Sequence, residues 1–273
     1  MTAEKKTRLH VPDILKLHKR GSRLVMVTAY DFTFARLLDG TSVELLLVGD
    51  SLSATVQGVD TTLPVTLDEM VYHSRLVVRG STRPMVVADM PFLSYQTGAR
   101  DALLAAGRLI KETGVGAVKL EGGARFARTV KVITRSGIPV MGHLGLLPQS
   151  YHQMGGYKVQ GQSAEEAQRL LDDAKKLEDA GTFAIVLEGI PSSVAETITS
   201  ALHIPTIGIG AGSSCSGQVL VLHDLLGLNA DDSRPAPKFV KRYANLGEEI
   251  KRAVQTYAEE VRTGVYPDKA HSY

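Results

Sequence analysis

The chain has 273 residues, of which 44% are hydrophobic and 22% are charged, and its net charge is +2. These values exclude an intrinsically disordered chain and leave no basic excess of the kind that neutralises nucleic-acid phosphates. No segment approaches the roughly 18 consecutive apolar residues that a membrane span requires, and the N-terminal residues lack the apolar stretch of an export signal. We therefore expect a cytoplasmic globular protein that binds neither nucleic acid nor membranes.

The chain contains one cysteine, Cys215. A single thiol excludes an intrachain disulfide and a thiolate metal cluster within one subunit. This cysteine usage is typical of a protein in a reducing compartment.

Short apolar runs rich in β-branched residues recur along the chain and alternate with longer segments of helical spacing. The runs cover residues 24–29, 43–49, 84–90, 116–122, 138–144, 183–189, 204–210 and 217–223. This alternation predicts parallel βα units in an α/β protein, and eight of them close into a (β/α)8 TIM barrel. An open doubly wound sheet is the alternative. At this length, a single domain over residues 1–273 is expected.

Helices are expected between the strands, before the first strand and after the last one. Residues 11–21, before the first strand, should close the bottom of the barrel. Residues after about Ser233 should form a C-terminal extension with a helix over residues 246–261. Amphipathic segments at residues 66–80, 99–114 and 163–181 predict helices between strands.

Glycines punctuate this pattern. Gly80, Gly114, Gly137 and Gly181 stand where helices should end, and a helix often ends in a left-handed backbone that glycine adopts without strain. Two long glycine-containing segments, residues 52–64 and 152–162, have the character of loops that cover an active site.

Polar residues fall at the end of one predicted strand after another. They are Asp50, Ser51, Asp89, Lys119, Glu121, His143 and Glu188. In a TIM barrel the catalytic groups lie at the carboxyl ends of the strands, so these positions are candidates for an active site. Side chains alternate along a strand, so Lys119 and Glu121 should point to the same face. For any one of these residues alone, a helix cap or a structural ion pair is the competing interpretation.

Several carboxylates at one barrel mouth repel each other unless positive charge lies among them, and Lys119 alone supplies too little. Oxygen ligands without cysteine favour Mg²⁺ or a similar hard cation. Such a cation polarises a carbonyl while a separate base removes the proton next to it. Glu188, across the barrel from Asp50 and Asp89, is the candidate base, and a structural carboxylate is the alternative.

The segments that carry these residues resemble one known family. They are VGDSLSATVQG (48–58), VVADMPF (86–92), VKLEGG (118–123), PVMGHLGLLPQS (139–150), GGYKVQG (155–161), VLEGIP (186–191) and IGIGAG (207–212). In order and spacing they are similar to ketopantoate hydroxymethyltransferase, over nearly the whole chain.

The resemblance implies a (β/α)8 barrel of the phosphoenolpyruvate/pyruvate type. It also implies an enzyme that transfers a hydroxymethyl group from 5,10-methylenetetrahydrofolate to 3-methyl-2-oxobutanoate. The product would be 2-dehydropantoate, in the first step of pantothenate biosynthesis. A homo-oligomer, a decamer in this family, is implied as well.

The same resemblance implies roles for individual residues. Mg²⁺ would be held by Asp50, Asp89 and Glu121. The substrate would contact Asp50, Ser51, Asp89, Lys119 and His143. The proton acceptor would be Glu188.

Two other functions compete with this interpretation. A Mg²⁺-dependent lyase or mutase of the phosphoenolpyruvate mutase and isocitrate lyase type shares the GDS motif after the second strand, but its KKCGH motif is missing here. A non-catalytic barrel that binds an oxo acid is the second alternative, although it would not need a base as well as metal ligands.

Overall fold

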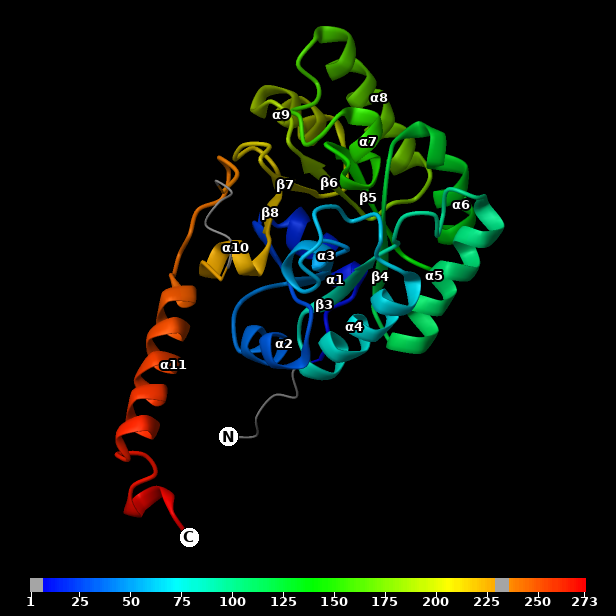
Figure 1. Cartoon of the computed structure of the whole chain (residues 1–273). Helices are drawn as coiled ribbons and strands as arrows, with labels where there is room; N and C mark the ends of the chain where they lie inside the picture. Colours follow the sequence, from blue (N-terminus) through cyan, green and yellow to red (C-terminus); the bar gives the residue numbers. More distant parts are fainter. Residues whose placement is uncertain (1–6, 229–235) are drawn as a thin grey trace. The chain divides into compact units, whose positions relative to one another are not determined.

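Eight parallel strands close into a barrel in chain order in the computed structural model, which describes residues 7–228 and 236–273 (Figure 1). The strands are β1 (Leu24–Thr28), β2 (Leu45–Val48), β3 (Met85–Asp89), β4 (Ala117–Glu121), β5 (Val140–Gly145), β6 (Ala184–Glu188), β7 (Thr206–Ile209) and β8 (Gly217–Leu220). Met26 pairs with Leu45 on one side and with Val219 on the other, which closes the ring. The predicted TIM barrel is confirmed, and the open sheet is excluded.

Continuous apolar runs form these strands because most of them are covered on both faces. Every residue of β2, β3, β4 and β5 is buried. Strands of a parallel sheet that face a packed interior on one side and helices on the other read as unbroken hydrophobic segments. The last strand was predicted to extend to residue 223, but it ends at Leu220 and helix α10 (Leu222–Leu226) follows.

The helix before the first strand contributes to the barrel core. In α1 (Val11–Lys19), Ile14 is fully buried in one cluster with Leu24, Leu45 and Met85, which open their strands. The predicted closure of the barrel bottom by residues 11–21 is therefore confirmed.

Helices surround the barrel on its outside (Figure 1). They are α2 (Phe32–Asp39), α4 (Leu67–Gly80), α5 (Ala99–Thr113), α6 (Ala127–Arg135), α8 (Ala164–Asp179) and α9 (Ser192–Ala201). The sequence fixes where two of them begin: capping boxes pair Thr66 with Glu69 in α4 and Ser163 with Glu166 in α8.

The segments predicted as loops contain short helices as well. Within residues 52–64 lies α3 (Leu52–Thr55), and α7 (Tyr151–Met154) overlaps residues 152–162. Two 3₁₀ turns, η1 (Ala124–Phe126) and η2 (Pro148–Ser150), follow β4 and β5. These segments lie beyond the carboxyl ends of the strands, where an active site is expected.

The glycines at the helix ends serve two different purposes. Gly114, Gly137 and Gly181 have φ values of 80°, 87° and 98°, so the left-handed backbone predicted for them is confirmed. The same prediction is wrong for Gly80. A Cβ atom there would lie 2.5 Å from the Phe32 carbonyl oxygen and 2.8 Å from the Ala35 Cβ, so this glycine allows α4 to approach α2 closely.

The chain forms two compact units, Met1–Leu220 and Val221–Tyr273. The second unit contains α10, α11 (Leu246–Thr263) and the 3₁₀ turn η3 (Lys269–His271). The helix predicted over residues 246–261 is confirmed, while the expected start of the extension near Ser233 lies outside the described residues. The single domain over residues 1–273 stays a prediction. In the described part of the chain, no helix combines the length and apolarity that a membrane crossing requires.

Candidate active site

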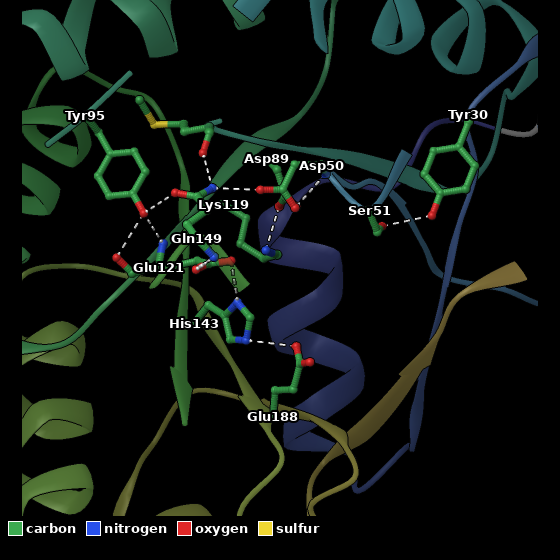
Figure 2. A network of polar contacts seen from close by, with 11 residues as sticks. Tyr30, Asp50, Ser51, Asp89, Tyr95, Lys119, Glu121, His143, Gln149 and Glu188 are labelled. Atoms are coloured by element: carbon green, nitrogen blue, oxygen red, sulfur yellow. Dashed lines mark hydrogen bonds and ion pairs between the residues drawn. The ribbon is translucent and has the colours of Figure 1, made fainter. Parts of the chain in front are cut away.

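The carboxyl ends of five neighbouring strands carry the side chains that the sequence predicted for the site (Figure 2). They are Asp50 and Ser51 after β2, Asp89 on β3, Lys119 and Glu121 on β4, His143 on β5 and Glu188 on β6. Asp50, Asp89, Lys119, Glu121 and His143 each expose only 2% to 4% of their surface. The barrel thus buries a dense group of ionisable side chains at one end.

Asp50, Asp89 and Lys119 form one part of this group. Lys119 Nζ lies 2.6 Å from Asp89 Oδ1, and the backbone N–H of Asp50 donates a 3.1 Å hydrogen bond to Asp89 Oδ2. Burial alone would lower the pKa of Lys119, but the carboxylates of Asp89, Glu121 and Asp50 outweigh it and raise that pKa. Lys119 is therefore a permanent cation in the site.

Negative charge exceeds positive charge around Asp50. Burial, and then the carboxylates of Asp89 and Glu121, raise the pKa of Asp50 well above its usual value, although Lys119 opposes them. A carboxyl group in this position gains stability in its ionised form from any further cation nearby.

Glu121, His143 and Glu188 form the second part. His143 Nδ1 lies 3.6 Å from Glu121 Oε1, and His143 Nε2 lies 3.2 Å from Glu188 Oε2. Neither ring nitrogen makes a hydrogen bond of good geometry within residues 7–228 or 236–273, so the contacts are electrostatic. Burial and Lys119 would lower the pKa of His143, but Glu121 and Glu188 outweigh them and raise it to about 9.

Glu188 differs from the other carboxylates in its access to solvent. Its side chain is 19% exposed, whereas that of Glu121, on the other side of His143, is 3% exposed. A group that exchanges a proton with a bound molecule has to be reachable from solvent, and Glu188 meets that condition.

Ser51 is held from β1. The hydroxyl groups of Tyr30 and Ser51 are 2.9 Å apart, and Tyr30 is fully enclosed directly after β1. Burial raises the pKa of Tyr30, so its hydroxyl stays protonated and keeps a hydrogen for this network.

Three residues of the network, Tyr30, Gln149 and Tyr95, were not predicted as site residues. Gln149, in η2, hydrogen-bonds Asp50 and Glu121, and Tyr95 hydrogen-bonds both Gln149 and the backbone of Glu121. Gln149 belongs to the segment PVMGHLGLLPQS, but nothing local marks it, since a lone glutamine after a proline suggests a turn. Only the folded chain brings it to Asp50.

The donor set fits a divalent cation held by few protein ligands. Among residues 7–228 and 236–273, no three His, Cys, Asp or Glu side chains converge closely enough to enclose a metal ion by themselves. Mg²⁺ commonly binds about one or two carboxylates and completes its octahedron with water and substrate oxygens. The excess of buried carboxylate around Asp50 provides that charge. The three-ligand set of Asp50, Asp89 and Glu121 stays a prediction.

A closed barrel with ionisable groups buried at the carboxyl ends of its strands defines a TIM-barrel enzyme. Among solved structures, 2,3-dimethylmalate lyase, a member of the PEP mutase/isocitrate lyase superfamily, is similar with a TM-score of 0.59 at 19% identity, covering 96% of this chain and 91% of that one. Phosphonopyruvate hydrolase in complex with oxalate and Mg²⁺ is similar with a TM-score of 0.60 at 11% identity, covering 96% and 93%. These similarities agree with the (β/α)8 barrel fold.

Sequence similarity then decides the family. The family model described as ketopantoate hydroxymethyltransferase matches residues 8–269. The 3-methyl-2-oxobutanoate hydroxymethyltransferase of Geobacter metallireducens is 55% identical over 261 residues, 96% of this chain and 97% of the relative. That of Syntrophus aciditrophicus is 52% identical over 274 residues, 100% of both chains. This chain belongs to the ketopantoate hydroxymethyltransferase family, so the resemblance seen in the sequence is confirmed and both alternatives lose their support.

Proposed function

We propose that this enzyme transfers a hydroxymethyl group from 5,10-methylenetetrahydrofolate to 3-methyl-2-oxobutanoate, giving 2-dehydropantoate in the first step of pantothenate biosynthesis. The relatives' names supply the acceptor. The observation that carries the proposal is the pairing of a solvent-accessible carboxylate, Glu188, with a buried cluster of Asp50, Asp89 and Lys119 in one barrel mouth. This combination can bind an oxo acid and remove a proton from it.

The metal in this proposal is Mg²⁺, and the carboxylates of Asp50, Asp89 and Glu121 serve its site, with about one or two of them bound to the ion directly. When bound, it would polarise the keto group of the oxo acid and stabilise the negative charge that develops there. Lys119 adds a fixed positive charge beside Asp89 for the same oxygens, and the hydroxyl of Ser51 provides a further contact to the substrate.

Glu188 is the proposed proton acceptor at C3 of the oxo acid. His143 is 3.2 Å from it and, with a pKa of about 9, carries a positive charge at neutral pH. This contact holds the Glu188 carboxyl group with Oε2 toward the His143 ring. The carbon that loses the proton then bonds to the folate methylene carbon as one of its two bonds to folate nitrogen breaks. Water replaces the second nitrogen and supplies the hydroxyl group, and tetrahydrofolate leaves with the proton from C3 and one proton from water on its nitrogens.

The second substrate, the methylene-folate, is bulky. Two cavities beside the strand ends support its binding there. A cavity of about 580 Å³ is lined by Gly122, directly after β4, and by Gly145, the last residue of β5. A second cavity of about 410 Å³ is lined by Tyr95 and Gln149. Both volumes lie in the usual range of about 300–1,000 Å³ for ligand pockets.

A metal-dependent aldol assay tests the function. The purified protein should form 2-dehydropantoate from the oxo acid only when the methylene-folate is present, and a chelator should abolish the product.

Glu188→Gln should still bind the oxo acid, but the exchange of the C3 proton of the oxo acid with deuterated solvent should be slower by about 10²–10⁴-fold. The exposed Glu196→Gln, on the helix after β6, is the matched control. Unchanged exchange in Glu188→Gln would remove that residue from the role of base.

The assembly and the compartment complete the proposal. The protein is proposed to be a homo-oligomer, a decamer, in the cytoplasm. Helix α11 buries none of its residues and exposes Ile250, Val254, Tyr257 and Val261 at helical spacing, an apolar face that supports association. Light scattering should give ten times the mass of the 29.4 kDa chain, and Val254→Lys should lower it. The buried free thiol of Cys215 supports a reducing compartment.

A further inference from the structure

Gln149 lies between two carboxylates of the site and touches both. It exposes 6% of its surface, and its side-chain Nε2 donates to Asp50 Oδ2 at 2.8 Å. Its backbone N–H donates to Glu121 Oε2 at 3.0 Å. One residue in the turn after β5 therefore contacts the carboxylates that follow β2 and end β4 (Figure 2).

The side-chain amide of Gln149 has only one favourable orientation. Its Nε2 also donates to the Met90 carbonyl oxygen at 2.9 Å, and its Oε1 accepts from the Tyr95 hydroxyl at 2.8 Å and from Gln96 Nε2 at 3.1 Å. A glutamine amide has two donor hydrogens and two acceptor lone pairs, and all four are used here. Turning the amide over would set its oxygen against the Asp50 carboxylate and the Met90 carbonyl, so the network itself assigns the orientation.

This orientation determines which carboxylate oxygen of Asp50 is available to bind a cation or a substrate. Oδ2 accepts from Gln149. Within residues 7–228 and 236–273, Oδ1 accepts no hydrogen bond. Glu121 is fixed in the same way: Gln149 occupies Oε2, and Oε1 faces His143. A carboxylate held by one oxygen presents the other in a single direction, without further loss of rotational freedom on binding.

We infer that Gln149 is a positioning residue that clamps Asp50 and Glu121, so that Asp50 presents Oδ1 to the divalent cation and the oxo acid. The inference rests on the proposed function, because it assigns Gln149 a role toward that metal and substrate. Tyr95 acts behind it by holding the amide in place.

The test removes the amide while keeping the size of the side chain. Gln149→Met removes the clamp on Asp50 but leaves the backbone bond to Glu121. The exposed Gln168→Met on α8 is the matched control. Mn²⁺ is the probe, and its binding to the protein without substrates is measured by electron paramagnetic resonance.

Gln149→Met should bind Mn²⁺ about 10- to 100-fold more weakly than the wild type. In turnover, the concentration of metal that gives half-maximal rate should rise, and excess metal should restore most of kcat. Circular dichroism and the unfolding midpoint should show that Gln149→Met is folded. A residue that only supported the fold would not be rescued by metal.

The outcomes separate this inference from the function on which it rests. Mn²⁺ affinity of Gln149→Met within about twofold of the wild type, with active wild-type enzyme, would overturn the positioning role alone. A wild type that neither binds Mn²⁺ nor forms product would overturn the proposed function and the inference with it.

Discussion

Two buried aspartates at opposite ends of the barrel show how differently the two ends are built. Asp39 lies near the amino ends of the strands, where its carboxylate accepts from the backbone N–H groups of Thr82 and Arg83 at 2.7 and 2.8 Å and from the Thr82 hydroxyl at 2.6 Å. Asp50 lies at the carboxyl ends, with the carboxylates of Asp89 and Glu121 as neighbours.

The pKa values of the two aspartates move in opposite directions for this reason. Burial would raise the pKa of Asp39, but the donors of Arg83 and Thr82 outweigh it and lower the pKa below its usual value of 3.8. Burial and like charges both raise the pKa of Asp50. Charge therefore stabilises the fold at the bottom of the barrel, while at the mouth it is retained at a cost in stability for binding and catalysis.

Removing the charge of Asp50 should give the largest effect. Asp50→Asn keeps the shape and an acceptor for Gln149 but should lower the rate of product formation at least about 100-fold, since even residues behind a metal ligand commonly cost 10- to 100-fold. The free energy of unfolding in the presence of chelator should not fall and should rise by up to about 2 kcal/mol, because carboxylate repulsion is relieved. Urea unfolding and the aldol assay measure the two effects, with exposed Asp179→Asn as control. A marked loss of stability would show that the two ends do not differ in this way.

A substitution at the bottom of the barrel should lower the stability of the protein and leave its activity unchanged. Ile14→Ala leaves a cavity where α1 packs on the strands and should lower the free energy of unfolding by about 2–5 kcal/mol. The rate per folded molecule should stay close to that of the wild type, because the site lies at the other end. Exposed Lys16→Ala in the same helix should change stability by less than about 0.5 kcal/mol. Loss of turnover in folded Ile14→Ala would mean that the two ends are coupled.

The smallest effect is expected at Asp39. Asp39→Asn loses charge-assisted hydrogen bonds to Thr82 and Arg83 and should destabilise the protein by about 1–3 kcal/mol at neutral pH. The folded pKa of Asp39 is lowered, so its contribution is present above pH 3.8 and disappears as the pH falls through the folded value. Unfolding measured from pH 7 downward should show the wild type and the variant converging below that pH. A constant difference at every pH would contradict the role of the charge.

The sequence predicted the eight strands because short apolar runs rich in β-branched residues alternate with segments of helical spacing. It predicted the site because polar residues fall at the ends of these runs. Lys119 and Glu121 could be placed on one face by alternation alone. Short helices such as α3 and α7 could not be predicted, since four residues are too few to show a helical period.

Local pattern and segment order therefore determined the barrel, the family and the residues at the strand ends, since burial and hydrogen bonding impose a fixed periodicity on each element. Only the tertiary structure decided that Gln149 and Tyr95 join the carboxylates, that His143 lies between Glu121 and Glu188, and that Gly80 is needed for the approach of two helices. Each of these depends on side chains distant in sequence meeting at hydrogen-bond or van der Waals distance. The pairing of the strands around the barrel and the packing of helices on it bring these side chains together. The spacing of residues along the chain does not reveal these contacts.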